Sequence, residues 1–409
     1  MHKTTDGVTR RKMMFQIAPA AAATAAAVAG IVPAMAADLS KTDPGPSNPQ
    51  LDAQNPDSIW PPPTDSKSLV QNFKYPFSFA NKRTYEGGWS REVTVRELPV
   101  SKTLAGVNMR LTPGGCRELH WHTAGEWAIM LDGTARITSI DKDGKSFVAD
   151  VKKYDLWFFP GGVPHSIQGL EPAGCEFMLV FDDGNFSESE TVLLSDAMAH
   201  LPPEVLSKNF GVDQQAFKNI PKQELFIFQA PVPASLEADQ KAAAADAGKS
   251  PIDFAFRTMQ MKPTKVTKGG EVRIVDSNNF KVTTTSMAMV TVHPGGLREL
   301  HWHQNADEWM YYIAGKGRMT VIDTGNKGRT MDFQAGDVGY INRTLLHYIE
   351  NTGDTDLVFL EMFKSPNFED LSFAEWLGHT PPELVMAHLK VDKATLDAMQ
   401  KTKSVVLPA

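Results

Sequence analysis

The side chains of this sequence that are best suited to chemistry come from a short stretch that the chain contains twice. Residues 117–126 read RELHWHTAGE, and residues 298–308 read RELHWHQNADE. Two histidines one residue apart lie on the same face of a β-strand, and a carboxylate shortly after them can return from the next strand to meet them. A further histidine follows each copy at a similar distance. The two sets are His120, His122, Glu126 and His165, and His301, His303, Glu308 and His347.

Metal ligation explains these two sets better than a structural role does. A single His-x-His pair is more often a pair of satisfied histidines in a strand. Here six of the 11 histidines fall into the two sets, and equivalent residues stand 181 or 182 positions apart. Three imidazoles and one carboxylate are a complete set of protein ligands for a divalent cation, with coordination positions left open. We therefore predict one mononuclear metal site in each half of the chain.

The ligand types narrow the choice of metal. Histidine and carboxylate with open positions suit an octahedral, redox-capable ion, for which manganese and iron are the natural candidates. A site without thiolates argues against structural zinc, which is usually closed and often rich in cysteine. By intrinsic affinity, copper and zinc would bind such a site in preference to manganese.

Residues 1–36 are typical of an export signal. The run TRRKMM at 9–14 resembles a twin-arginine motif, an alanine-rich apolar run follows it, and AMA at 34–36 offers a cleavage site. The apolar run is shorter than the ~20 residues that span a bilayer, so we expect no stable membrane insertion after cleavage. The mature protein is predicted to be periplasmic or secreted. Because this route exports folded protein, the cytoplasm can select the metal before export.

The charge of the chain excludes one class of partner and sets a condition on the substrate. Cleavage after residue 36 removes four basic residues and one acid, which takes the formal net charge from −7 to −10. An acidic chain without basic runs gives no reason to expect nucleic acid as a partner. The same negative field repels a dianion, so local arginines must attract an anionic substrate.

The rest of the chain predicts an all-β protein with two domains. Short segments of alternating apolar and polar residues recur between turns that contain Gly, Pro or Asp, for example at 93–98, 106–111, 135–140 and 177–181. Many short, evenly spaced strands suggest double-sheet jelly rolls, and short helices are expected after each set of strands. The predicted boundaries are an extended arm at 37–66, a first domain at 67–230, a linker at 231–250 and a second domain at 251–409.

At these residues the chain resembles the cupin superfamily. The spacing G-x5-H-x-H-x3-E-x6-G over 114–133 is similar to the first cupin motif, and residues 295–315 repeat it with one extra residue. The second cupin motif is kept more loosely around His165 and His347. The resemblance covers about residues 70–400 and is strongest to the bicupin oxalate decarboxylases, through RELHWH, DLWFFP and FDDGNFSE. It implies two tandem cupin domains, each a jelly-roll β-sandwich.

The resemblance also implies an activity. A bicupin of this kind converts oxalate, or a similar small carboxylate, to formate and CO2, with two Mn(II) per chain and iron as the alternative metal. O2 is implied as a co-catalyst that is not consumed, and a homo-oligomer, either trimer or hexamer, is implied as the assembly. Two alternatives stay open. One is an oxalate oxidase that yields CO2 and hydrogen peroxide, and the other is an exported manganese-binding bicupin without catalysis.

The resemblance assigns Arg117 and Arg298 to the grip on a substrate carboxylate, for which the forked guanidinium is suited. Both arginines stand three residues before the first ligand histidine of their half. On a regular strand, that spacing turns them away from the metal. The assignment therefore requires a bend in the strand, and the alternative is a structural ion pair in each half.

The same resemblance places a proton donor, Glu188, on a lid loop after the last strand of the first half. Cleavage of the C–C bond of oxalate leaves a one-carbon fragment that needs a nearby proton to become formate; otherwise it is oxidised to CO2, with peroxide. The first half has three more residues than the second at or beside 187–191. Ser189 and Glu190 stand where the family commonly has Asn and Ser, which leaves the balance between decarboxylase and oxidase open. The alternative for Glu188 is a solvated loop acid.

The remaining candidates have two interpretations each. Glu361 stands where the first half has Leu179, and it is either a proton relay at the second metal or the partner of a buried arginine. Cys116 and Cys175 are either a disulfide, which export permits, or two buried free thiols.

Overall fold

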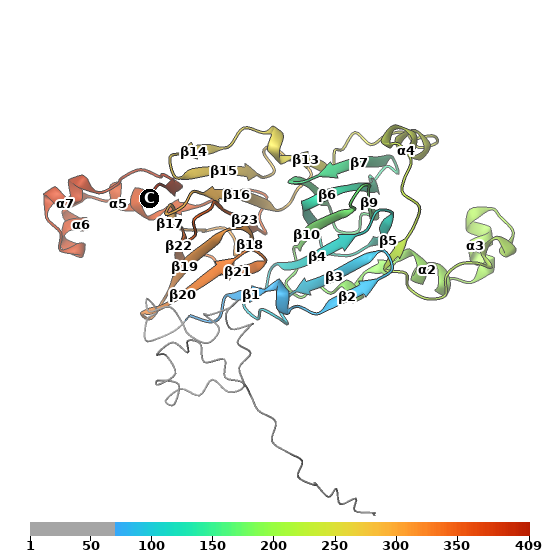
Figure 1. Ribbon diagram of the computed structural model, residues 1–409, viewed down its shortest axis with the longest axis horizontal. Coiled ribbons are helices and arrows are strands. Elements are labelled where there is room, and N and C mark those ends of the chain that lie inside the picture. Colours follow the sequence, from blue (N-terminus) through green and yellow to red (C-terminus); the bar gives the residue numbers. More distant parts are fainter. Residues whose placement is uncertain (1–69) are drawn as a thin grey trace, which may run out of the picture. The chain divides into compact units, whose positions relative to one another are not determined.

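The computed structural model describes residues 70–409, which form two β-rich halves with the same order of strands (Figure 1). The predicted signal at 1–36 and most of the region before the first strand, including the arm at 37–66, lie outside the described residues. Among the helices within residues 70–409, none is long and apolar enough to cross a bilayer. The predicted all-β class is confirmed, because the helices are short and the strands make up the body of both halves.

The first half is a sandwich of antiparallel strands. Its strands are β2 (Lys82–Tyr85), β3 (Gly88–Val93), β4 (Ala105–Leu111), β5 (Gly115–Trp121), β6 (Glu126–Ile140), β7 (Ser146–Lys152), β8 (Asp155–Phe159), β9 (His165–Gly169), β10 (Cys175–Phe181), β11 (Val192–Leu193) and β12 (Ile227–Gln229). The start of β6 pairs with β8 and β10, and its end pairs with β7 and β9, so this strand joins the two layers. It turns from one layer to the other at Gly133, whose φ is 71° and where a Cβ would lie 2.0 Å from the carbonyl oxygen of Gly174.

The second half repeats this arrangement with two separate sheets. Its strands are β14 (Lys265–Thr267), β15 (Gly270–Val275), β16 (Ser286–Val292), β17 (Leu297–Trp302), β18 (Glu308–Ala314), β19 (Lys316–Asp323), β20 (Lys327–Gln334), β21 (Asp337–Ile341), β22 (Leu346–Asn351), β23 (Leu357–Phe363), β24 (Leu371–Ser372) and β25 (Val406–Leu407). One sheet has the order β21-β18-β23-β16-β15-β14, and the other has the order β20-β19-β22-β17-β24. Gly315, with a φ of 82°, separates β18 from β19 where Gly133 bends β6.

Each half gives an edge strand to the other half. β1 (Lys74–Pro76), which the predicted boundary at 67 assigns to the first domain, pairs with β21 of the second half. β13 (Ala255–Arg257), which the boundary at 251 assigns to the second domain, pairs with β8 of the first half. An edge strand pairs through its backbone with any sheet that offers free partners, so the side-chain pattern carries no sign of this exchange.

Two apolar cores support the strands that carry the candidate ligands. One core lies in the first half and includes Trp157 and Phe177. The other extends across both halves and includes Trp127 of the first and Trp309 of the second. Burial of one such side chain contributes about 1.5–3 kcal/mol, so the two halves are joined by packing as well as by the exchanged strands.

Short helices follow the strands of each half, as predicted. They are α2 (Leu194–His200), α3 (Pro203–Phe210) and η6 (Gln214–Phe217), then α5 (Phe373–Gly378), α6 (Pro382–Leu389) and α7 (Lys393–Ala398), with η4 (Phe77–Phe79) and η7 (Thr258–Gln260) in connections. Pro203 and Pro382 stand in the first turn of their helices, where no backbone N–H is required. The predicted linker at 231–250 contains a helix, α4 (Leu236–Ala243), and Asp239 of this helix forms an ion pair with Arg136.

The strand predicted at 93–98 is wrong. β3 ends at Val93, and residues 95–100 form turns. The backbone N–H and the hydroxyl of Thr94 both donate to the carboxylate of Glu97 at 2.8 Å. A local bond between side chain and backbone therefore closes a turn here, against the alternating pattern.

Candidate metal centres

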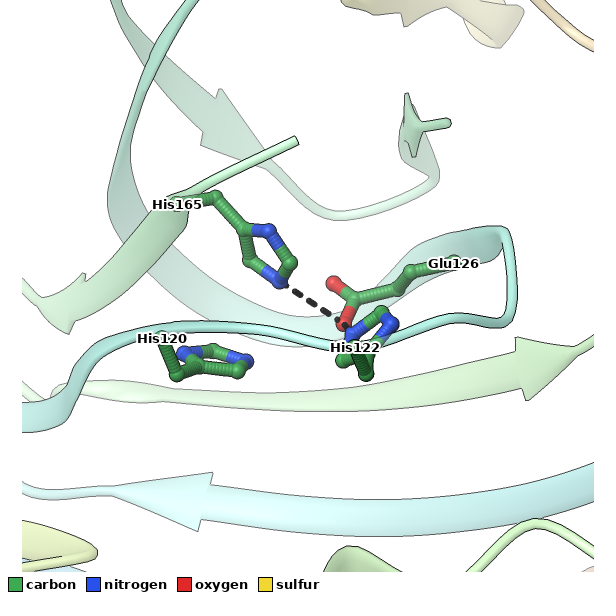
Figure 2. Close-up of side chains that lie close together, drawn as sticks. All are labelled: His120, His122, Glu126 and His165. Carbon is green, nitrogen blue, oxygen red and sulfur yellow. Dashed lines mark hydrogen bonds and ion pairs between the residues drawn. The ribbon is translucent and has the colours of Figure 1, made fainter. Parts of the chain in front are cut away.

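Three strands of the first half bring the first predicted ligand set together (Figure 2). His120 lies on β5 and His122 directly after it, Glu126 begins β6, and His165 begins β9. All four side chains are buried, and their ligand atoms lie within 4.8 Å of one another. Nε2 of His122 and Nε2 of His165 lie 3.3 and 3.2 Å from Oε2 of Glu126. Figure 2 shows the three imidazoles and the carboxylate pointing toward a common centre.

The second predicted set has the same arrangement. His301 lies on β17 and His303 directly after it, Glu308 begins β18, and His347 lies on β22. The ligand atoms again lie within 4.8 Å of one another, in a buried position. Nε2 of His303 and of His347 lie 3.3 and 2.9 Å from Oε2 of Glu308. Both predicted clusters are therefore confirmed.

Backbone carbonyl groups fix the orientation of all six imidazoles. Nδ1 of each histidine lies within hydrogen-bond distance of a carbonyl oxygen and donates to it, which leaves the lone pair of Nε2 facing the cluster. A neutral imidazole held in this tautomer is the form that binds a metal ion. The acceptors are Glu118, Ala124 and Val163 for His120, His122 and His165, and Glu299, Glu369 and Leu345 for His301, His303 and His347, at 2.6–2.9 Å.

The polar atoms of the second cluster test whether a metal ion fits. Nε2 of its three histidines and both carboxylate oxygens of Glu308 are buried. With the histidine protons on Nδ1, the short separations between Nε2 and Oε2 join two acceptors, so these atoms have no hydrogen bond within residues 70–409. A buried polar group without a partner costs about 1–3 kcal/mol, and one divalent cation among these atoms would satisfy them together. Neutral nitrogens with a carboxylate oxygen suit manganese or iron, so the residues fit the predicted metal.

The carboxylates of the two clusters are held differently. Nε1 of Trp157 donates to Oε1 of Glu126 at 3.0 Å, which leaves Oε2 toward the histidines. The residue 182 positions after this tryptophan is Gly339, and Glu308 has no equivalent bond within the described residues. Burial alone would raise the pKa of Glu126, but the neighbouring histidines hold this pKa well below its ordinary range, so the carboxylate is anionic.

The bend required by the family resemblance is present in both halves. The register of β5 against β9 shifts between Arg117 and His120, and the register of β17 against β22 shifts between Arg298 and His301. A bulge of this kind re-aims a side chain relative to strict alternation. Both arginines are buried. Burial and then the charge of Arg117 hold the pKa of His120 well below its ordinary range, which is consistent with an arginine on the metal side of the strand.

The guanidinium of Arg298 is hydrogen-bonded to two carboxylates. Its Nε donates to Oε1 of Glu361 at 2.9 Å, and its Nη2 donates to Oε2 of the same residue at 3.3 Å. Nη2 also donates to Oδ2 of Asp370 at 3.0 Å. The side chains of Arg298 and Glu361 are both 0% exposed. These contacts match the interpretation of Glu361 as the partner of a buried arginine.

Arg117 lies in different surroundings. It forms no ion pair within residues 70–409, and the residue at the position of Glu361 is Leu179. Its Nη1 donates to the carbonyl oxygen of Phe226 at 3.3 Å, and its guanidinium lies 4.0 Å from the centroid of that ring. A buried guanidinium with unused donors beside a ligand cluster is suited to bind a carboxylate of a small molecule.

The predicted three-residue insertion is confirmed, and it forms a 3-10 turn, η5 (Glu188–Glu190). Val192 of β11 and Leu371 of β24 each pair with the tryptophan between the ligand histidines of their half. These two residues are 179 positions apart, whereas β10 and β23 correspond at 182 positions, so three residues are added between these strands. We call residues 187–191 the lid segment.

Glu188 is buried within the lid segment, with 2% of its side chain exposed, so the alternative of a solvated loop acid is wrong. Its Oε2 accepts hydrogen bonds from Nη2 of Arg83 at 2.7 Å and from the hydroxyl of Ser90 at 2.8 Å. Two residues earlier, the ring of Phe186 lies 5.7 Å from the imidazole of His122. The lid segment therefore begins beside the first cluster.

Several residues around the first cluster were beyond the reach of the sequence patterns. Trp157 stands in the DLWFFP segment, and the resemblance of that segment to the family was the only indication in the sequence that this residue lies near the site. Arg83 and Ser90 reach the lid segment from strands about a hundred positions earlier, and Phe226 reaches Arg117 from a segment after the helices. Spacing within one segment carries no sign of such distant pairings.

The two cysteines do not form a disulfide. Cys116 and Cys175 are free and buried, so the disulfide alternative is wrong. Burial raises the pKa of each thiol to about 12, which leaves almost no reactive thiolate near neutral pH.

Comparison with known proteins gives the class of the chain. The family model for cupins matches residues 77–218 and 258–397, which correspond to the two halves of the structure. The chain therefore belongs to the cupin family and carries two cupin domains. This agrees with the two β-sandwiches and with one buried ligand cluster in each.

Within the cupins, the similarity is to oxalate decarboxylases and extends over most of the chain. The chain is 50% identical to oxalate decarboxylase OxdC from Bacillus subtilis over 363 residues, which cover 88% of this chain and 93% of the relative. It is 37% identical to a probable oxalate decarboxylase from Arthroderma benhamiae over 89% of this chain and 90% of the relative. A solved structure of the Bacillus subtilis enzyme, studied for its Mn(II) centres, has a TM-score of 0.84 and 49% identity, and covers 89% of this chain and 96% of that one. The chain belongs to the bicupin oxalate decarboxylase family.

Proposed function

We propose that this protein converts the oxalate monoanion to formate and CO2, with the substrate bound in the first half beside Arg117. The observation that carries the proposal is the buried guanidinium of Arg117, which has no ion-pair partner within residues 70–409 and lies beside a complete ligand cluster. Relatives that span most of the chain are oxalate decarboxylases. The reaction is balanced without net oxidation, so O2 enters the proposal as a co-catalyst that is not consumed.

Each group of the first metal site has a separate role in the proposed reaction. Bound manganese supplies a Lewis acid for a carboxylate of oxalate and a one-electron redox couple. Arg117 donates its forked N–H groups to the substrate and fixes its orientation. Glu188 donates the proton to the carbon that C–C cleavage leaves behind, and the lid segment excludes water. The ligands that would hold manganese are His120, His122, Glu126 and His165.

The surroundings of Glu188 suit a proton donor. Burial raises the pKa of this carboxyl, and the charges of Arg117 and Arg83 and the hydroxyl of Ser90 oppose the rise only in part. A larger share of Glu188 is therefore protonated at mildly acidic pH than of an exposed glutamate. A protonated acid at this place favours formate over the CO2 and peroxide of the oxidase alternative.

We propose that the second metal site has a structural or electron-storing role. Its arginine, Arg298, already binds Glu361 and Asp370. Nη1 of Arg298 has no hydrogen-bond partner within residues 70–409, but the charge of the guanidinium is already balanced by two carboxylates. A third anion buried beside it would be poorly compensated. The ligands of this site would be His301, His303, Glu308 and His347.

We also propose that the protein assembles as a trimer or hexamer. The helices after both sandwiches expose large apolar side chains, including Phe210 at 55% and Leu384 at 59%. Equivalent exposed surfaces on the two halves suit contacts between copies of the same chain. Analytical ultracentrifugation tests this, and a monomer at micromolar concentration would contradict it.

The proposal for the location of the protein is export to the periplasm or beyond through a twin-arginine signal at 1–36. It is supported by the TRRKMM run and the AMA site described above. Replacement of Arg10 and Arg11 by Lys should retain the protein in the cytoplasm, as fractionation would show. Export of this variant at the level of the parent would contradict the proposal.

Product stoichiometry tests the main proposal. Purified, manganese-loaded protein given oxalate in air is expected to release formate and CO2 in equal amounts. Glu188→Gln should lose formate, whereas Glu190→Gln, a change at the exposed neighbour in the same turn, should keep it. Peroxide without formate would establish the oxidase alternative. No turnover with two manganese ions bound would leave a metal-binding protein.

A further inference from the structure

The carboxylate of Glu188 is held by a hairpin that lies outside the metal cluster. Arg83 of β2 and Ser90 of β3 are direct partners across this hairpin, so their side chains reach the same point. Nη2 of Arg83 lies 2.7 Å from Oε2 of Glu188, and the hydroxyl of Ser90 lies 2.8 Å from the same oxygen. One oxygen of the lid acid therefore accepts two hydrogen bonds from one structural element.

The neighbours of Glu188 in the lid segment contact the same hairpin. The backbone N–H of Glu188 donates to Oε2 of Glu92 on β3 at 3.3 Å. Nη1 of Arg83 lies 3.5 Å from the hydroxyl of Ser189. The lid segment is thus attached to β2 and β3 through both side chain and backbone, and a charge-assisted bond from a cation is the strongest of these contacts.

The cation of this attachment is itself fixed in place. The guanidinium of Arg83 lies 5.2 Å from the centroid of the Phe226 ring, and the guanidinium of Arg117 lies 4.0 Å from the same centroid. Phe226 therefore contacts both the arginine that holds the lid acid and the arginine that faces the substrate site. A rearrangement of Arg83 would therefore change the surroundings of both Glu188 and Arg117.

We propose that Arg83 and Ser90 are positioning residues for the Glu188 acid, and that their hydrogen bonds fix the lid segment beside the first metal site. This inference rests on the proposed function, in which Glu188 donates a proton to the substrate carbon. Secure positioning directs turnover to formate. A loose lid segment allows O2 to take both electrons of oxalate with two protons, which gives two CO2 and one H2O2.

The charges that face Glu188 make the inference testable by pH. They come from Arg83 on β2, Glu92 on β3 and Arg117 on β5, and the neutral side chains of Ser90 and Tyr85 also face this carboxyl. Arg83 lowers the pKa of Glu188, so its removal raises this pKa. The alkaline limb of formate production should then move to higher pH, which a merely structural role for Arg83 would not cause.

The variants are Arg83→Met, Arg83→Lys and Ser90→Ala, compared with Lys82→Met. Lys82 lies on the same strand with its exposed side chain over Trp89, and within residues 70–409 no side-chain hydrogen bond or ion pair joins it to the lid segment. Arg83→Met is expected to lower the rate of formate production about tenfold and to raise the share of peroxide. Arg83→Lys should restore part of the formate, and Lys82→Met should behave like the parent.

A double variant separates an effect through Glu188 from a general one. If Arg83 acts through Glu188, then Arg83→Met should not further lower the residual rate of formate production, or further speed the exchange of the lid amides, in Glu188→Ala, because the interaction is already lost. Additive losses would overturn the inference. So would a parent-like share of peroxide and a parent-like pH profile in both Arg83→Met and Ser90→Ala.

Hydrogen exchange tests positioning without relying on catalysis. The amides of residues 187–191 should exchange faster in Arg83→Met than in the parent. Their exchange rates in Lys82→Met should equal those of the parent. Equal exchange in all three proteins would overturn the inference even if the parent makes formate. Faster exchange in Arg83→Met than in the parent, together with a parent that makes no formate, would uphold the positioning role and overturn the proposed function alone.

Discussion

Arg298 donates to both carboxylate oxygens of Glu361, at 2.9 and 3.3 Å, and neither side chain is exposed to solvent. The first half has Arg117 at the matching place, with Leu179 where the glutamate would be. The protein itself therefore neutralises one arginine, whereas the other has no ion-pair partner within residues 70–409. This difference, more than any difference between the metal ligands, distinguishes the two halves as sites for an anionic substrate.

Transfer of the glutamate to the first half should abolish that distinction. Leu179→Glu is expected to raise the KM for oxalate about tenfold or more, because the new carboxylate competes for the donors of Arg117. Steady-state kinetics on the manganese-loaded variant gives the measurement. Leu179→Gln is the control, since it adds a side chain of similar size without charge. Equal KM values in the two variants would show that Arg117 does not bind the substrate.

The pair in the second half should contribute to stability and not to chemistry. Glu361→Leu leaves the charge of Arg298 buried with only Asp370 nearby, which should cost about 3–5 kcal/mol in the free energy of unfolding. Urea unfolding of the variant gives this value. The double change with Arg298→Met should recover much of it, because both buried charges are then absent. Loss of formate with unchanged stability would instead make Glu361 a proton relay.

The two metal sites should respond differently to the loss of a ligand. His120→Ala and His301→Ala should each retain one manganese per chain by elemental analysis, but formate production should end only in His120→Ala. Removal of both metals with a chelator should lower the free energy of unfolding, by about 2.7 kcal/mol per site at a metal concentration a hundredfold above Kd. Loss of formate in both folded variants would mean that the second site takes part in turnover.

The metal ligands could be predicted from the sequence because coordination fixes both residue type and spacing, and the second copy acts as an internal control. The inward direction of Arg117 could not be derived in the same way. It depends on a bulge between Arg117 and His120 that forms against β9, and alternation along one strand predicts the opposite face. The family resemblance supplied the bend that local periodicity could not.

Contacts between distant segments mark the limit of what the sequence reveals. Arg83 reaches Glu188 across 105 positions, and β1 and β13 add themselves to the sheets of the opposite half. Neither leaves a periodic trace, because a polar contact at one point or a backbone pairing at a sheet edge requires no repeated side-chain pattern. The order of the strands was predictable, whereas the neighbours of the lid acid were not.

The two cysteines should be inert in the folded protein. Burial raises the pKa of Cys116 and Cys175 to about 12, so iodoacetamide at pH 7.5 should modify neither before unfolding and both in urea. Mass spectrometry of the intact protein gives the count of added groups. Rapid alkylation of the native protein at Cys116 would contradict this prediction and would show that this part of β5 opens to solvent.

The pH dependence of formate production should report the protonation of Glu188. Burial raises its folded pKa above the ordinary value of 4.5, with Arg117 and Arg83 opposing part of the rise. The acid can donate only while it is protonated, so the ratio of formate to peroxide should be high below the folded pKa and fall as pH rises through it. Measurement of both products from pH 3 to pH 8 gives this profile. Because oxalate also titrates at acidic pH, Glu188→Gln is the control: a pH dependence of total oxalate consumption that survives in this variant belongs to the substrate. A ratio that stays constant with pH in the parent would mean that another group delivers the proton.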